Sequence, residues 1–108
     1  MSSETLSSEH QDFYKRFQSF WAAPSAERVL EIIAPDAKIH FTGAGHMDGK
    51  TYAAFMGETL AAMEGVKVTP MDCAGNGDVL YIAWETVATL HGSQRTYRGV
   101  DRFRIKDG

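Results

Sequence analysis

The chain has 108 residues, a formal net charge of −3 and an apolar content of 44%. This length and this apolar content predict a single domain with its own core. The lysines and arginines are scattered along the chain, so no basic patch favours binding to nucleic acid or to an anionic membrane.

The cysteine, histidine and hydropathy patterns exclude several further classes of protein. The single Cys73 excludes an internal disulfide and a thiolate metal cluster. The four histidines are too dispersed for their spacing to indicate a zinc site. Apolar runs stay shorter than the roughly 18 residues of a spanning helix, and residues 1–10 lack the pattern of a signal peptide. We therefore expect a cytoplasmic protein that binds neither nucleic acid nor membranes.

Two short helices are predicted in the first third of the chain. Ser8 and Gln11 resemble a capping box, which predicts a helix over 8–23 that ends before Pro24. A second helix is predicted over 26–33. The first carries an aromatic face at helical spacing, formed by Phe13, Phe17, Phe20 and Trp21.

A strand, a loop and a third helix follow. Residues 37–42 alternate polar with apolar and predict a strand, and the glycine-rich segment 43–49 predicts a loop. The third helix is indicated by a buried stripe and by Gly65 at its C-terminal cap. The stripe contains Tyr52, Phe55, Met56, Leu60 and Met63.

Three antiparallel strands in meander order are predicted for the rest of the chain, over 66–73, 79–91 and 95–106. Asp107 and Gly108 form a hairpin-turn dipeptide. Either a further strand belongs after Gly108, or the sheet has an open edge that another element must cover. At the other end of the chain, we expect residues 1–7 to be disordered.

The last predicted strand places an acid between aromatic residues. Its period of two puts Tyr97, Gly99, Asp101 and Phe103 on one face and Arg98, Val100, Arg102 and Arg104 on the other. Burial of Asp101 would disfavour its ionised form and favour a neutral donor or a general acid. The alternative is a structural ion pair between Asp101 and a neighbouring Arg or His.

This order of elements, closing on the segment Arg-Gly-Val-Asp-Arg-Phe-Arg-Ile-Lys-Asp-Gly at 98–108, resembles the nuclear transport factor 2-like superfamily, and within it the SnoaL-like and ketosteroid isomerase-like domains. The resemblance implies an α+β fold in which a curved antiparallel sheet wraps around three helices to form a cone. It also implies one domain over 1–108, with a hollow interior that holds a ligand.

The resemblance places Asp101 at the isomerase's oxyanion-hole acid, which stays protonated so that it can donate a hydrogen bond. It places Phe17 at the oxyanion tyrosine and Phe41 at the aspartate base. Phenylalanine cannot transfer a proton, so steroid isomerisation by the usual Tyr and Asp pair is not expected.

The inward faces of the predicted elements supply candidate ligand contacts. Trp84 and Thr86 share a face of the middle strand, and aromatics of the first helix could face them across the hollow. We expect Phe17, Phe41, Trp84 and Asp101 to line one cavity; plain core packing is the alternative. The full set of expected ligand-binding residues is Phe13, Tyr14, Phe17, Trp21, Phe41, Phe55, Trp84, Thr86, Tyr97 and Phe103.

His46, in the glycine-rich segment, is the second candidate catalytic residue beside Asp101, since an imidazole titrates near neutrality. A solvated loop histidine is the alternative. His40 is expected outside the hollow, and His10 and His91 are expected to be solvated.

Three functions remain open. The first is a cofactor-independent and metal-independent cyclase, isomerase or dehydratase that acts on a polyketide-like or steroid-like compound, with Asp101 as donor or acid. The second is a non-catalytic ligand-binding module with the same pocket. The third is an interaction module that dimerises through the sheet face, and a homodimer is compatible with all three.

Overall fold

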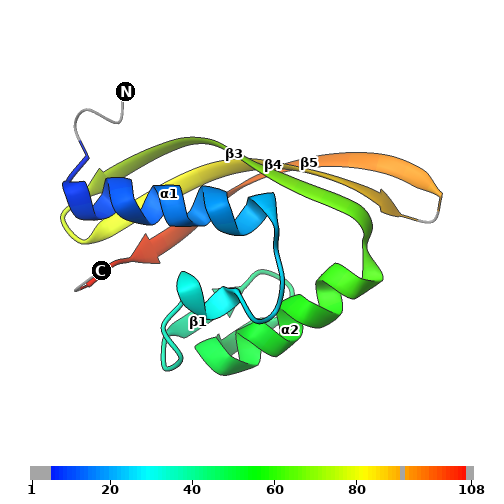
Figure 1. Cartoon of the computed structure of the whole chain (residues 1–108), viewed down its shortest axis with the longest axis horizontal. Coiled ribbons are helices and arrows are strands. Elements are labelled where there is room, and N and C mark those ends of the chain that lie inside the picture. Colours follow the sequence, from blue (N-terminus) through cyan, green and yellow to red (C-terminus); the bar gives the residue numbers. More distant parts are fainter. Residues whose placement is uncertain (1–5, 91, 107–108) are drawn as a thin grey trace.

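The computed structural model describes residues 6–90 and 92–106, and its elements are arranged as two layers (Figure 1). A long three-stranded sheet forms one layer, and the helices lie with a small hairpin in the other. In chain order the elements are α1 (Ser8–Ala22), the one-turn 3₁₀ helix η2 (Val29–Glu31), β1 (Lys38–Phe41), β2 (Gly45–Asp48), α2 (Gly49–Ala62), β3 (Glu64–Asn76), β4 (Val79–Leu90) and β5 (Ser93–Arg104).

The N-cap of helix α1 lies one residue before the predicted cap. The Ser7 hydroxyl accepts a hydrogen bond from the backbone N–H of His10 at 3.2 Å, so Ser7 is the N-cap. Leu6, just before this cap, is buried in the core. Of the segment expected to be disordered, only residues 1–5 lie outside the described part of the chain. The aromatic face of α1 is buried as predicted, through Phe13, Phe17 and Phe20.

The second predicted helix, over 26–33, is wrong: the chain forms only the single 3₁₀ turn η2 there. Arg28 accounts for the difference, because its side chain holds the connection against the end of α1. Its guanidinium donates to the backbone oxygens of Ser19 and Ala23 at 3.0 and 2.9 Å, and it also pairs with Glu31 at 3.0 Å. The described residues therefore form two α-helices rather than three.

The predicted glycine-rich loop over 43–49 is also wrong in part. Residues Gly45–Asp48 form β2, which pairs antiparallel with β1 and places Lys38 opposite Asp48. Gly43 and Gly45 both have a φ of 88°, a left-handed conformation that glycine adopts without steric cost. These two glycines close a tight hairpin where the sequence pattern indicated an open loop.

Helix α2 follows this hairpin without a linker. The Asp48 carboxylate accepts from the backbone N–H of Thr51 at 2.7 Å and so caps the helix. Gly49 is buried, and a Cβ at this position would collide with the backbone oxygen of Ala34. The start of α2 is thereby fixed against the segment that precedes β1.

The main sheet is the predicted antiparallel meander, in the order β3-β4-β5. The pairing of β4 with β5 runs without a bulge from Val79 opposite Arg104 to Leu90 opposite Ser93. Both α-helices lie on the same side of the sheet (Figure 1), which leaves its other face uncovered. Alternation along β4 follows this division, because Leu80 and Ile82 are fully buried whereas Tyr81 is 46% exposed.

The core has two clusters that meet at α1. One joins the aromatic face of α1 to the inner face of the sheet, and it contains Phe13, Phe17, Leu80 and Ile82. The other joins the end of α1 to η2 and α2, and it contains Phe20, Val29 and Met56. Among the described helices, none is long and apolar enough to cross a membrane.

The sequence analysis placed His10 in solvent, and this prediction is wrong. The side chain is 3% exposed, and a Cβ added to Gly75 would collide with its imidazole ring. The glycine therefore lets β3 lie directly against the first turn of α1. His91, Asp107 and Gly108 fall outside the described residues, so expectations about them stay predictions.

The alternation of the sheet can be tested with two substitutions on neighbouring strands. Ile82→Ala removes a fully buried side chain, and we expect it to lower the free energy of unfolding by about 2–5 kcal/mol in urea denaturation. Val100→Ala, at a position 62% exposed on the outer face, should change it by less than about 1 kcal/mol. Equal losses from both variants would contradict the assigned faces.

Candidate functional site

Asp101 lies on the inner face of the sheet, as the sequence pattern predicts. It stands opposite Ile82 in the β4–β5 pairing, and its side chain is half-buried, whereas Val100 and Arg102 on either side are exposed. Within the described residues, no Lys, Arg or His forms an ion pair with this carboxyl group. The structural ion pair considered above is therefore not found.

Trp84 lies beside Asp101 because Gly99 makes room for it. Trp84 and Gly99 are directly paired, and a Cβ built on Gly99 would lie 2.5 Å from Cζ2 of the indole. The ring thus covers the glycine, a packing that any side chain at position 99 would block. Its Nε1 atom is buried and has no hydrogen-bond partner among the described residues.

The surroundings of Asp101 favour its neutral form. Burial raises the pKa of the Asp101 carboxyl above its ordinary value, and the nearby indole N–H of Trp84 opposes part of this rise. The N–H is close enough to act electrostatically on the carboxyl but does not meet the geometry of a hydrogen bond. The result is a carboxyl group that remains protonated to higher pH than an exposed aspartate.

Tyr52 of α2 completes this group, and sequence analysis missed its role. Burial, and then the negative charge of Asp101, raise the pKa of the Tyr52 hydroxyl, so the phenol stays protonated. The sequence pattern placed Tyr52 in the buried stripe of its helix. The only hint of a polar role was a hydroxyl within an otherwise apolar stripe.

The aromatic residues near this group belong to two packed layers. Phe41 contacts the rings of Tyr52 and Phe55, with centroids 6.1 and 5.0 Å apart. Phe103 packs on Phe13 and Phe17 at 4.8 and 5.5 Å. The structure therefore places Phe41 and Phe55 on the Tyr52 side, and uses Phe13, Phe17 and Phe103 to join α1 to the sheet.

The remaining predicted ligand contacts are dispersed. Thr86 is buried on the inner face of β4. Tyr14 faces β3 instead of Asp101: burial, Cys73 and Asp72 raise the pKa of its hydroxyl. Tyr97 is 45% exposed although it lies on the inner face. Trp21 lines a separate hollow, described below.

His46 is not near Asp101. It stands directly opposite His40 in the β1–β2 hairpin, and the two imidazole rings stack with centroids 4.6 Å apart. Both histidines are exposed, whereas Phe41, the neighbour of His40, is half-buried. The predicted faces of His40 and Phe41 are thus confirmed, and the geometry does not join His46 to the candidate acid.

Hollows on the surface of the described residues include the following two. One of about 440 Å³ lies between the end of α1 and β3. The other, of about 520 Å³, lies along β1 and β2 and includes His46. Neither is lined by Phe17, Phe41, Trp84 or Asp101, so a single cavity bounded by these four stays a prediction.

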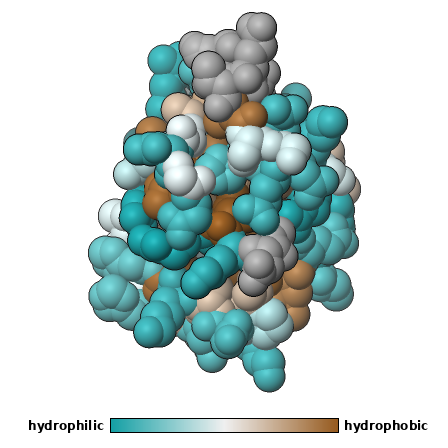
Figure 2. Space-filling view, turned by 90° about the vertical axis from the view of Figure 1, so that its left-hand side faces the viewer, coloured by the Kyte–Doolittle hydropathy of each residue, from teal (hydrophilic) through white to brown (hydrophobic). Residues whose placement is uncertain are grey.

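Apolar side chains are exposed to solvent at the end of the molecule where α1 begins (Figure 2). There, apolar surface is visible at the centre, set back within a rim of polar side chains (Figure 2). Among the described residues, no three His, Cys, Asp or Glu side chains are grouped so that they could hold a metal ion. Around Asp101, the groups that can form hydrogen bonds are its own carboxyl, the Tyr52 hydroxyl and the Trp84 N–H, beside the aromatic side chains described above.

Comparison with known families agrees with this fold. The sequence profile of the SnoaL-like domain matches residues 14–108. The chain belongs to the SnoaL-like family. No curated protein sequence matches it closely enough to count as a relative.

Solved SnoaL-like and related structures share the architecture. TerC, crystallised with polyporic acid, is 17% identical, with a TM-score of 0.78 over 94% of this chain and 85% of its own. IdmH, a putative polyketide cyclase from Streptomyces antibioticus, is 19% identical, with a TM-score of 0.78 over 93% and 85%.

A third structure is a ketosteroid isomerase-like protein from Catenulispora acidiphila in complex with trimethylamine. It is 16% identical, with a TM-score of 0.74 over 89% of this chain and 77% of its own. At these identities the likeness establishes the nuclear transport factor 2-like fold of the SnoaL-like chain.

The raised pKa of Asp101 has a consequence for stability. Between the ordinary carboxyl pKa and the raised folded value, the unfolded chain is ionised while the folded chain still holds a proton, so rising pH costs the folded state stability. Asp101→Asn removes this cost. We expect the stability that the variant gains over wild type to grow as the pH rises above the ordinary carboxyl pKa, seen as a growing difference in melting temperature between about pH 3 and pH 7.

Thermal melts across this pH range would measure the difference. Glu85→Gln, which changes a carboxyl group on the outer face of the sheet, serves as the control for a general charge effect. If Asp101→Asn becomes less stable relative to wild type as the pH rises, the carboxylate is stabilised in the fold, which would contradict this prediction.

Proposed function

We propose that the inner face of the sheet binds a small, largely apolar cyclic compound of the polyketide or steroid type, and that Asp101 acts on one of its oxygens as hydrogen-bond donor or general acid. The reaction class is a cofactor-independent isomerisation, cyclisation or dehydration of an enolisable substrate. The observation that carries the proposal is the grouping of a carboxyl whose pKa is raised by burial with the Tyr52 hydroxyl and the buried Trp84 N–H.

The chemistry follows from these donors. When a ketone loses a proton from its α-carbon to a water molecule or a buffer base, negative charge develops on the carbonyl oxygen. A protonated Asp101 and the Tyr52 hydroxyl can each donate a hydrogen bond to that oxygen, and a donor placed there in advance stabilises the transition state more than the ground state. Each such donor contributes roughly 10²–10³ in rate in enzymes that use them.

The ligand class is supported by the surroundings and by relatives of the same fold. Phe41, Phe55 and Trp84 offer flat apolar surfaces around the donors, which suits a ring-shaped ligand. TerC was crystallised with polyporic acid, and IdmH is described as a putative polyketide cyclase. Phe17 and Phe41 carry no titrating group, so we do not expect steroid isomerisation by the usual Tyr and Asp pair.

Proton exchange on a simple ketone tests the donor role. With 2-tetralone in deuterated buffer, we expect the protein to accelerate exchange of the α-protons, measured by proton NMR. Asp101→Leu should remove roughly 99% or more of this acceleration, because it deletes a transition-state donor. Asp101→Asn keeps one donor and should lose less than the Leu variant, and Tyr52→Phe should fall between Asn and wild type.

Binding measured beside exchange separates catalysis from ligand binding. Polyporic acid serves as the binding probe, and His46→Ala is the control variant because His46 lies away from Asp101. If the Asp101→Leu variant accelerates exchange of the α-protons of 2-tetralone as much as wild type does, Asp101 is not the donor. If wild type binds polyporic acid but accelerates no exchange, the protein is a non-catalytic ligand-binding module, the second function considered above.

The uncovered face of the sheet supports a homodimer. Three exposed apolar side chains lie on strands of this face or in its bulge, Met71, Tyr81 and Val100, and the salt bridge from Arg98 to Glu85 at 3.0 Å lies beside them. Exposed apolar residues bordered by charges are typical of a contact between subunits. We infer that two copies pair through this face.

Sedimentation experiments would test the pairing. Wild type should sediment as a dimer at about 100 µM, and Val100→Glu should shift it to monomer because a charge would be buried in the contact. Lys50→Glu on α2, on the helical side of the molecule, should leave the dimer intact. A monomeric wild type at this concentration would contradict the proposal.

A further inference from the structure

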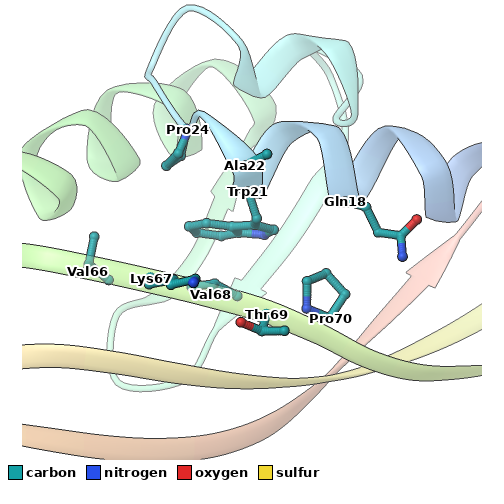
Figure 3. A pocket seen from close by; sticks show the side chains of 9 residues that line it. All are labelled: Gln18, Trp21, Ala22, Pro24, Val66, Lys67, Val68, Thr69 and Pro70. Carbon is teal, nitrogen blue, oxygen red and sulfur yellow. The ribbon is translucent and has the colours of Figure 1, made fainter.

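The hollow between the end of α1 and the start of β3 is distinct from the Asp101 group. It has a volume of about 440 Å³, within the range of small-molecule sites. Figure 3 shows the Trp21 ring between α1 and β3, with Gln18 and Pro70 to one side and Pro24 and Val66 to the other. The complete lining is Gln18, Trp21, Ala22, Pro24, Val66, Lys67, Val68, Thr69 and Pro70.

Trp21 gives this hollow both an apolar surface and an unused donor. The ring is half-buried, and its Nε1 atom is buried without a hydrogen-bond partner among the described residues. Figure 3 shows this nitrogen at the end of the ring that is turned toward Gln18 and Pro70. A buried N–H that lacks an acceptor costs about 1–3 kcal/mol, and a ligand oxygen that enters beside Gln18 would remove that cost.

The described residues that line the hollow include a positively charged side chain and no negatively charged one. The chain as a whole, by contrast, is net negative. The polar groups that the lining offers are the ammonium of Lys67, the amide of Gln18 and the hydroxyl of Thr69, in addition to the indole N–H. Within the described strands only β4 pairs with β3, so the β3 backbone at this edge also has free donors.

These features suit one class of ligand. Val66, Val68 and Pro70 line the hollow along β3 with apolar surface, and the Trp21 ring can stack on a flat ring system. Donors without acidic competitors favour an anionic acceptor such as a carboxylate. We propose that this hollow is a second binding site, which takes a flat aromatic carboxylate independently of Asp101.

The indole N–H groups allow a direct test. The chain has two tryptophans, so a ¹⁵N-labelled sample gives two indole N–H signals, and Trp84→Phe leaves only that of Trp21. Titration with 2-naphthoate should move the Trp21 signal in a saturable manner, with a Kd below about 1 mM. The neutral 2-naphthamide, which has the same rings without the charge, should bind at least about tenfold more weakly.

Substitutions in the hollow supply the matched controls. Lys67→Gln removes only a charge from an exposed side chain, and should weaken 2-naphthoate binding several-fold while leaving 2-naphthamide unchanged. Lys50→Gln, on α2 outside the lining, should weaken neither. Trp21→Phe keeps a ring but deletes the donor, and should weaken 2-naphthoate about tenfold, as followed by the backbone amide signals of Lys67 and Val68. The Trp84 indole signal of this variant reports that the fold is intact.

The outcomes distinguish this site from the proposed function. Asp101→Asn should leave 2-naphthoate binding at Trp21 unchanged, so loss of ketone exchange and loss of naphthoate binding are separate results. A titration that moves only the Trp84 signal would assign the ligand to the Asp101 side and overturn the proposal. The absence of a saturable shift up to about 10 mM, or equal binding by wild type and Lys67→Gln, would also overturn it.

Discussion

The packing of the aromatic face of α1 on the inner face of the sheet is the interaction on which the rest of the structure depends. Phe13 and Phe17 contact Phe103 of β5, and Leu80 and Ile82 of β4 are fully buried beneath them. Burying each of these side chains stabilises the fold by roughly 1.5–3 kcal/mol. This contact occupies one part of the inner face, and Trp84 and Asp101 lie next to it on the same strands.

Gly99 then determines how Asp101 is surrounded. Without a side chain at this position, the Trp84 indole can lie against β5, where it shields the neighbouring carboxyl from water and brings its N–H close. Tyr52 of α2 lies close enough for the charge of Asp101 to raise the pKa of its hydroxyl. Burial beside the indole thus raises the pKa of one carboxyl group on a surface that is otherwise apolar.

The sequence predicted those parts of the structure that depend on local periodicity. The alternation in β5 placed Asp101 inward and Val100 outward, and helical spacing identified the buried face of α1. The short connections were predicted less well, because Arg28 and the glycines at 43 and 45 act through tertiary contacts or a specific φ. A helix over 26–33 and a loop around His46 were the corresponding errors.

Contacts between distant elements could not be predicted in the same way. Tyr52 and Asp101 are far apart in the chain, and only the position of α2 against the sheet brings them together. Trp21 fitted the aromatic stripe of α1, but its place at the end of the helix directs it to the free edge of β3. Periodicity indicates which face a residue occupies, whereas the partner on the opposite layer depends on how the layers are stacked.

The alternation of burial in β5, which runs from Gly99 to Arg104, also separates two kinds of evolutionary change. Gly99, Asp101 and Phe103 face the interior, where each is constrained by a specific neighbour, whereas Val100 and Arg102 contact the outside. A lineage could therefore exchange outer residues without altering the packing one residue away. The same strand can keep its inner surface while its outer surface diversifies.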